Sequence, residues 1–210
     1  MKFRPIEHGL VMGKPAEGYV RSPGLHMSDI YGSLYKALMP KRYDKRDSKG
    51  DPLPFNQTYM ELGSAFEEVL EPALRDRLLG AERPGEFTTL DGTNVIYSPD
   101  QFIFQGGKFY LGEFKLTWMT NTSITDPKFD KWLCQMKAYC FHLETPYALL
   151  YAFFVNGSGW TKGKADSGLP QLTAWEFEFS AKELSENWQT LKRHAERTGL
   201  LPFPPLTQGV

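Results

Sequence analysis

The chain has 210 residues, of which 41% are hydrophobic, 14% aromatic and 23% charged, with a net charge of −1. This length predicts one domain with a core around a central sheet, and the composition is that of a globular protein without repeats or low-complexity segments. The near-neutral charge argues mildly against nucleic-acid binding, because affinity for phosphates comes largely from Lys and Arg.

Membrane and metal-cluster classes are disfavoured by two further features. The longest strongly apolar run, Tyr147 to Val155, has nine residues and is too short to cross a bilayer, and the first ten residues lack the apolar region of a signal peptide. The only cysteines are Cys134 and Cys140, which are too few for a four-cysteine iron-sulfur or zinc site. We therefore expect a cytoplasmic protein with free buried thiols, no membrane contact and no iron-sulfur cluster.

The N-terminal quarter is expected to carry little regular structure. Residues 1–24 are rich in Gly and Pro and predict an extended arm, followed by a short helix from Asp29 to Met39 that Ser28-Asp29 caps and Pro40 ends. A loop then runs to Pro54, and residues 36–49, from the end of the helix into this loop, hold six Lys and Arg against two Asp. This basic segment is either a contact for a phosphate backbone or an ordinary solvated loop.

Residues 57–79 have apolar positions at helical spacing and predict a second helix, which Pro72 should kink. Gly63 and Glu67 are four residues apart and share one helix face, with Glu71 one turn further along. A glycine there allows close approach of a ligand that the carboxylate could reach. An exposed acidic helix face is the other interpretation.

The strongest local signal lies in residues 93–118, where a Gly106-Gly107 pair separates two runs of aromatic and β-branched residues. Such a pair predicts a β-hairpin, because the favoured two-residue turns need positive φ angles. With these glycines in the turn, the strand register brings Asp100 opposite Glu113. Lys115 points to the same face as both carboxylates, because side chains alternate along a strand.

Both faces of this hairpin are expected to be buried. The face of the three charged residues continues into a core through Phe102, Phe104, Phe109 and Leu111. The opposite face is covered by Ile103, Tyr110, Phe114 and Leu116. Because both sides of the hairpin are expected to be buried, the three charged residues are not explained as exposed charges on a surface strand.

The facing carboxylates predict a metal site. Directly opposed residues have Cβ atoms roughly 4.5 to 5.5 Å apart, so two carboxylates there repel each other unless a divalent cation lies between them. Oxygen ligands suit Mg²⁺ or Mn²⁺ better than zinc. Such a cation activates water and neutralises charge on a phosphate, with Lys115 assisting, which indicates hydrolysis of a phosphodiester. The alternative is a surface hairpin with an incidental ion pair.

Residues 128–143 predict a helix with two rows of side chains. One row is apolar and faces the core: Leu133, Met136, Cys140 and Leu143. The neighbouring row consists of Trp132, Gln135, Tyr139 and His142. Taken alone, Gln135 and Tyr139 fit ordinary residues at the edge of the core, and we interpret His142 as structural.

The rest of the chain alternates strands and a helix. Tyr147 to Val155 predicts a buried strand, and Leu172 to Phe179 a half-buried one, with a glycine-rich loop between them. Ser180 and Glu183 form a capping-box pattern before a helix of about Ala181 to Arg197. The Pro-rich tail cannot continue that helix.

Ser98-Pro99-Asp100, followed after twelve residues by Glu113-Phe114-Lys115, resembles the signature of the PD-(D/E)XK nucleases. In that family the Asp and the Glu bind the metal, the carbonyl of the residue between Glu and Lys completes the shell, and the Lys is catalytic. The resemblance implies Asp100, Glu113 and the Phe114 carbonyl as metal ligands and Lys115 as a catalytic residue.

Two further motifs resemble the RecB-like and lambda-exonuclease-like (YqaJ-type) branches of the family. These branches carry Gly-x-x-x-Glu in the helix before the Pro-Asp, matched by Gly63 and Glu67, and Gln-x-x-x-Tyr after the lysine, matched by Gln135 and Tyr139. The resemblance implies that Glu67 is an additional metal ligand, with Glu71 as a substitute. It also implies that Gln135 orients DNA or a catalytic group, with Tyr139 in support.

The implied architecture is an α/β, restriction-endonuclease-like core with a mixed central β-sheet flanked by helices. In a single domain, residues 1–56 form the arm, short helix and basic loop, residues 57–198 the nuclease core and residues 199–210 the tail.

The implied function is that of a Mg²⁺- or Mn²⁺-dependent deoxyribonuclease, an exonuclease of DNA recombination, repair or phage DNA processing. The alternatives are a structure-specific endonuclease or resolvase, and a non-catalytic DNA-binding recombination partner on the same fold. Expected partners are DNA, a separate annealing protein or helicase, and further copies of the chain.

Overall fold

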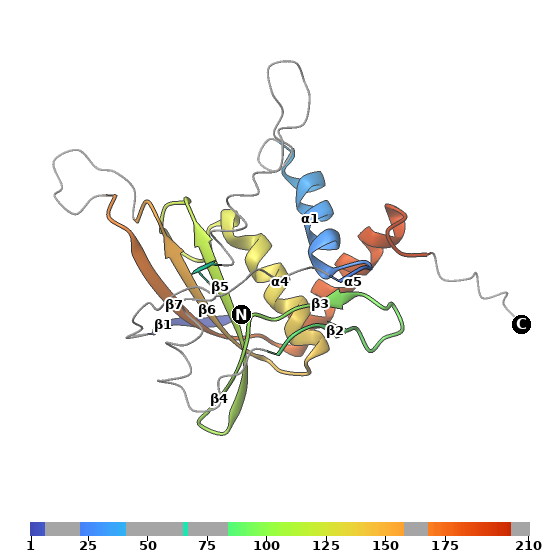
Figure 1. Cartoon of the computed structure of the whole chain (residues 1–210), viewed down its shortest axis with the longest axis horizontal. Coiled ribbons are helices and arrows are strands. Elements are labelled where there is room, and N and C mark those ends of the chain that lie inside the picture. Colours follow the sequence, from blue (N-terminus) through green and yellow to red (C-terminus); the bar gives the residue numbers. More distant parts are fainter. Residues whose placement is uncertain (7–21, 41–64, 67–83, 158–167, 203–210) are drawn as a thin grey trace, which may run out of the picture.

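The computed structural model describes residues 1–6, 22–40, 65–66, 84–157 and 168–202 (Figure 1). The described strands and helices follow in the order β1 (Lys2–Ile6), α1 (Met27–Leu38), β2 (Phe87–Thr88), β3 (Ile96–Tyr97), β4 (Gln101–Gln105), β5 (Lys108–Thr117), the 3₁₀ turn η1 (Pro127–Phe129), α4 (Asp130–His142), β6 (Tyr147–Phe154), β7 (Gln171–Glu178) and α5 (Ala181–Arg197).

Among the described residues, the central sheet has five strands in the order β1-β7-β6-β5-β4. Only the pair β5 and β6 is parallel within this sheet, and the other neighbouring pairs are antiparallel. A parallel pair needs a crossover connection, which η1 and α4 supply between β5 and β6. The predicted α/β class with a mixed central sheet flanked by helices is confirmed, and it is compatible with a restriction-endonuclease-like core.

The sheet is buried on both faces. Helices α1, α4 and α5 lie together on one side of it (Figure 1), where α4 packs on β5 and β6 and the other two helices pack on α4. Their core cluster includes Leu111, Leu150 and Phe177. A second cluster on the opposite face includes Ile103 and Phe114, which are almost fully buried. The expectation of two-sided burial is therefore correct for the centre of the hairpin.

The tip of the hairpin differs from the expectation. Phe104 is 56% exposed rather than part of the core, and Phe102 and Phe109 are only partly buried. The β4–β5 hairpin extends past the helices in Figure 1, so none of the helices that the structure describes covers its tip. These three rings instead pack against one another, with centroids 4.9 Å apart between Phe102 and Phe109 and 5.0 Å between Phe104 and Phe109.

The first residues form a strand, which corrects the predicted extended arm. β1 pairs antiparallel with β7 at the edge of the sheet. Two ion pairs join the strands, from Lys2 to Glu178 at 3.3 Å and from Arg4 to Glu176 at 2.6 Å. Residues 7–21 lie outside the described part of the chain.

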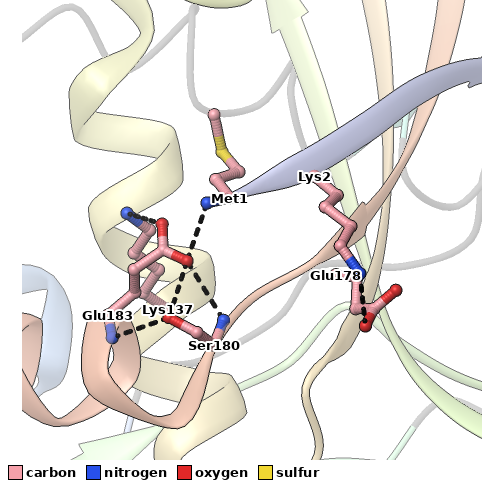
Figure 2. Close-up of polar contacts among 6 residues, drawn as sticks. All are labelled: Met1, Lys2, Lys137, Glu178, Ser180 and Glu183. Atoms are coloured by element: carbon pink, nitrogen blue, oxygen red, sulfur yellow. Dashed lines mark hydrogen bonds and ion pairs between the residues drawn. The ribbon is translucent and has the colours of Figure 1, made fainter.

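The chain start also contacts the first turn of α5 (Figure 2). The amino group of Met1 lies 2.8 Å from Oε2 of Glu183, which also accepts hydrogen bonds from the backbone and hydroxyl of Ser180. The predicted capping box is thus confirmed. Burial raises the pKa of Glu183, but these hydrogen bonds and the charge of Lys137 outweigh it and lower the pKa to about 2.

Two helix starts differ from the sequence expectation. α1 is capped by His26, whose backbone N–H donates to Asp29 Oδ2 at 3.0 Å, rather than by Ser28. α4 begins at Asp130 because Pro127 opens a short 3₁₀ turn instead of the helix itself. Among the described residues, none of the helices has the length and apolar character that a bilayer crossing requires.

Candidate active site

The β4–β5 hairpin has the predicted turn and register. Gly106 and Gly107 have φ angles of 57° and 73°, the left-handed values that the turn requires. Gln101 pairs with Gly112, and the next position in the same register places Asp100 opposite Glu113. Local turn chemistry therefore positions both carboxylates.

Asp100 lies just before β4 and is attached to the backbone of β5. Its Oδ2 accepts a hydrogen bond from the N–H of Phe114 at 2.7 Å. Phe114 separates Glu113 from Lys115, so this bond holds the Asp100 carboxylate beside the segment that carries the other two charged groups. The Phe114 side chain points to the opposite face, where it packs against Tyr151.

Glu113 is completely buried and is the centre of the site. Its Oε1 accepts a hydrogen bond from Nε2 of Gln135 at 2.6 Å and forms an ion pair with the ammonium group of Lys115. The Lys115 side chain is 20% exposed, so this ion pair reaches from the core toward solvent. Strand β5 and helix α4 thus bring together three residues that are up to 22 positions apart in the sequence.

Tyr139 lies one helical turn after Gln135 and is buried. Burial raises the pKa of its phenol well above the usual value, and the nearby Tyr31, Glu113 and Asp100 raise it further. The phenol therefore keeps its proton at neutral pH. It can support the site as a neutral group.

The available ligand atoms fit a hard divalent cation. Asp100 and Glu113 supply carboxylates, and the Phe114 carbonyl is the third oxygen that the sequence motif suggests. In the part of the chain that the structure describes, no group of three or more His, Cys, Asp or Glu could hold a metal ion. Glu67, predicted as an additional ligand, lies outside the described residues, as do Gly63 and Glu71. The all-oxygen set suits Mg²⁺ or Mn²⁺ and lacks the nitrogen and sulfur ligands of zinc.

Two residues near the site were not predicted from the sequence. Lys131 in the first turn of α4 experiences the charge of Lys115, and Tyr31 of α1 lies near Tyr139. Lys131 is four residues before Gln135, so the helical spacing that linked Gln135 to Tyr139 would also have identified it. For Tyr31 we find no signal in the sequence, because its place depends on how α1 packs on α4.

No protein-family profile matches the chain, and no curated protein matches its sequence. Among solved structures, the fold is similar to the crystal structure of SSO0001, with a TM-score of 0.53 and 16% sequence identity over 87% of this chain and 78% of that chain. A looser similarity, with a TM-score of 0.37 and 15% identity, covers 84% of this chain and 93% of LHK-Exo in complex with dAMP. The similarity to SSO0001 shows a shared fold alone, and the activity is argued from the site.

Proposed function

We propose that the protein is a metal-dependent nuclease that hydrolyses phosphodiester bonds in DNA. The observation that carries this proposal is the fully buried Glu113, which faces Asp100 across a hairpin and is contacted by both Lys115 and Gln135. Burying a carboxylate together with an amide and most of a lysine side chain is costly for a residue set without a function. The sequence motifs that resemble PD-(D/E)XK nucleases fall on these same residues.

Asp100 and Glu113 would hold Mg²⁺ or Mn²⁺ with the Phe114 carbonyl, and Glu67 is proposed as an additional ligand. When bound, the cation supplies Lewis-acid stabilisation of charge on the phosphate and lowers the pKa of water. Lys115 has the exposure and position to donate hydrogen bonds to the attacking water or to a phosphate oxygen. Gln135 fixes the Glu113 carboxylate through its hydrogen bond, and Tyr139 supports this arrangement as a neutral phenol.

An exonuclease that acts in DNA recombination, repair or phage DNA processing is our preferred form of this activity. Such an enzyme needs a free DNA end, whereas a structure-specific endonuclease or resolvase does not. Both would use the same carboxylates, so substrate topology is the property that separates them. A separate annealing protein or helicase and a homo-oligomer are the partners we propose for the exonuclease.

The test is digestion of linear duplex, single-stranded and covalently closed circular DNA with Mg²⁺ or Mn²⁺, with EDTA as the blank. Degradation of linear DNA alone supports the exonuclease. Cutting of the closed circles replaces it with the endonuclease. Binding of DNA without cleavage of any substrate contradicts the nuclease proposal and favours a non-catalytic DNA-binding protein.

A further inference from the structure

Helix α4 carries a second lysine near the candidate site. Lys131 is the second residue of α4 and lies one turn before Gln135, whose side chain reaches Glu113. Residues four apart on a helix lie on neighbouring positions of one face, so Lys131 and Gln135 extend the same row. The Lys131 ammonium lies 5.5 Å from the centre of the Tyr31 ring, which places it between α1 and α4.

This lysine is partly buried and lies near another cation. Burial lowers the pKa of Lys131, and the positive charge of Lys115 lowers it further. Two ammonium groups in a partly buried region favour a bound anion, because the anion offsets their repulsion and their lost hydration. Lys115 already has Glu113 as one such partner, and Lys131 also lies over the Tyr31 ring.

We propose that Lys131 is a substrate-binding residue that contacts a backbone phosphate of the nucleic acid beside the bond that is cut. The inference rests on the proposed nuclease function and extends it to a residue outside the recognised motifs. Lys115, paired with Glu113, serves the reacting phosphate, and Lys131, one helical turn from Gln135, binds a neighbouring phosphate through its ammonium donors. An ammonium group binds phosphate as a compact charge with three donors and reads no base, so this contact adds affinity without sequence preference.

The experiment compares Lys131→Met, Lys131→Arg and the control Lys182→Met with the wild type. Methionine keeps much of the chain length without the charge, and Lys182 is an exposed lysine on α5 whose ion pair with Glu186 lies outside the site. Binding of a labelled linear duplex is followed by fluorescence anisotropy between 50 and 200 mM salt in Ca²⁺, and gels confirm that the DNA stays intact. Cleavage in Mg²⁺ gives kcat and KM, and thermal unfolding reports the fold.

The proposal predicts that Lys131→Met weakens DNA binding about tenfold and reduces the slope of log K against log salt by about 0.9, the value for one phosphate contact. KM should rise by a similar factor while kcat stays within about threefold, and Lys131→Arg should restore most of the affinity. Lys182→Met should bind like the wild type. Wild-type binding and salt slope in Lys131→Met would overturn the inference, as would an equal loss in both methionine variants or a loss that follows reduced thermal stability.

The binding assay separates this inference from the proposed function. Lys131-dependent binding without cleavage by the wild type would contradict the nuclease and leave the phosphate contact intact. Cleavage that is unaffected by Lys131→Met, at unchanged KM and salt slope, would retain the nuclease and reject the contact. Failure of the wild type to bind DNA would reject both.

Discussion

The ion pair of Glu113 and Lys115 permits a quantitative prediction about stability in the absence of metal. Glu113 is fully buried, so Lys115→Met would leave its charge with the hydrogen bond from Gln135 but without its counter-ion. Removing one partner of a buried ion pair costs about 3 to 5 kcal/mol. Because the Lys115 side chain is 20% exposed and solvent screens part of the interaction, we expect the lower end of this range, about 3 kcal/mol.

The compensating change is Glu113→Gln, which removes the buried charge and keeps the shape of the side chain. The double variant Lys115→Met with Glu113→Gln should recover most of the loss and unfold within about 1 kcal/mol of the wild type, since replacing both partners of a buried pair is often neutral. The free energies of unfolding come from urea titrations at neutral pH in EDTA, with equal m-values as a check on the two-state analysis.

A loss below about 1 kcal/mol in Lys115→Met would mean that solvent or another group already satisfies Glu113 without the lysine. A double variant as unstable as Lys115→Met would mean that the lysine stabilises the fold by packing rather than by charge. Either result would refute the view of a charge-paired, desolvated carboxylate at the centre of the site.

Three further predictions concern the scaffold, each measured by urea unfolding. Burial lowers the pKa of His142 to about 4, with the charge of Asp91 opposing this only in part. In the unfolded chain His142 has a pKa of about 6.5, so between pH 6.5 and 4 it binds a proton that it does not bind in the folded chain. The free energy of unfolding should therefore fall by about 3 kcal/mol as the pH drops from 6.5 to 4, and His142→Phe should flatten that slope. A Cβ at Gly112 would lie 2.9 Å from the Cβ of Gln101, so Gly112→Ala should lower the free energy of unfolding by about 1 to 3 kcal/mol. A Cβ at Gly106 would meet open space, so Gly106→Ala should cost only about 1 to 2 kcal/mol for its left-handed backbone, and a loss well above this range would contradict the account. Ser180→Ala removes the acceptor of the helix-capping bond and should cost about 1 kcal/mol, whereas unchanged stability would mean that water replaces the cap.

The hairpin could be predicted because its determinants are local. Two glycines with positive φ fix the turn, and the strict two-residue period then decides which side chains share a face. The same holds for the start of α5, where Ser180 and Glu183 are three residues apart and form the cap that the sequence indicates. Both features needed no knowledge of distant parts of the chain.

The missed features depend on distant partners. β1 contains Pro5, which weakens any strand prediction, and it becomes an edge strand only because β7 provides a partner more than 160 residues away. Phe104 was expected in the core because the two-residue alternation of the strand puts it on the core-facing side. The described helices end before the hairpin tip (Figure 1), and Phe104 is exposed there. Periodicity predicts which face a side chain occupies, and it does not predict how far the next layer extends.

The candidate site contains one feature that the local sequence determines and one that depends on a distant contact. The opposition of Asp100 and Glu113 follows from hairpin register alone, whereas the contact of Gln135 with Glu113 requires α4 to cross from β5 to β6 over the correct face. Resemblance to a family motif supplied Gln135, since helical spacing by itself also fits a core residue. Lys131 is on the same helix face and could be reached by helical spacing, but it belongs to no recognised motif, and its nearness to Lys115 depends on how α4 packs.

The most direct test of the account is metal-dependent cleavage of linear duplex DNA by the wild type, Glu113→Gln and Glu178→Gln. The control residue is a surface glutamate paired with Lys2 at the sheet edge, so its change makes the same chemical substitution outside the site. We predict that the wild type and Glu178→Gln cleave in Mg²⁺ or Mn²⁺ and not in EDTA. Glu113→Gln should retain its fold by circular dichroism and lose roughly 99% or more of the cleavage rate. Cleavage by folded Glu113→Gln at the wild-type rate would show that the buried carboxylate is not the metal ligand on which the account depends.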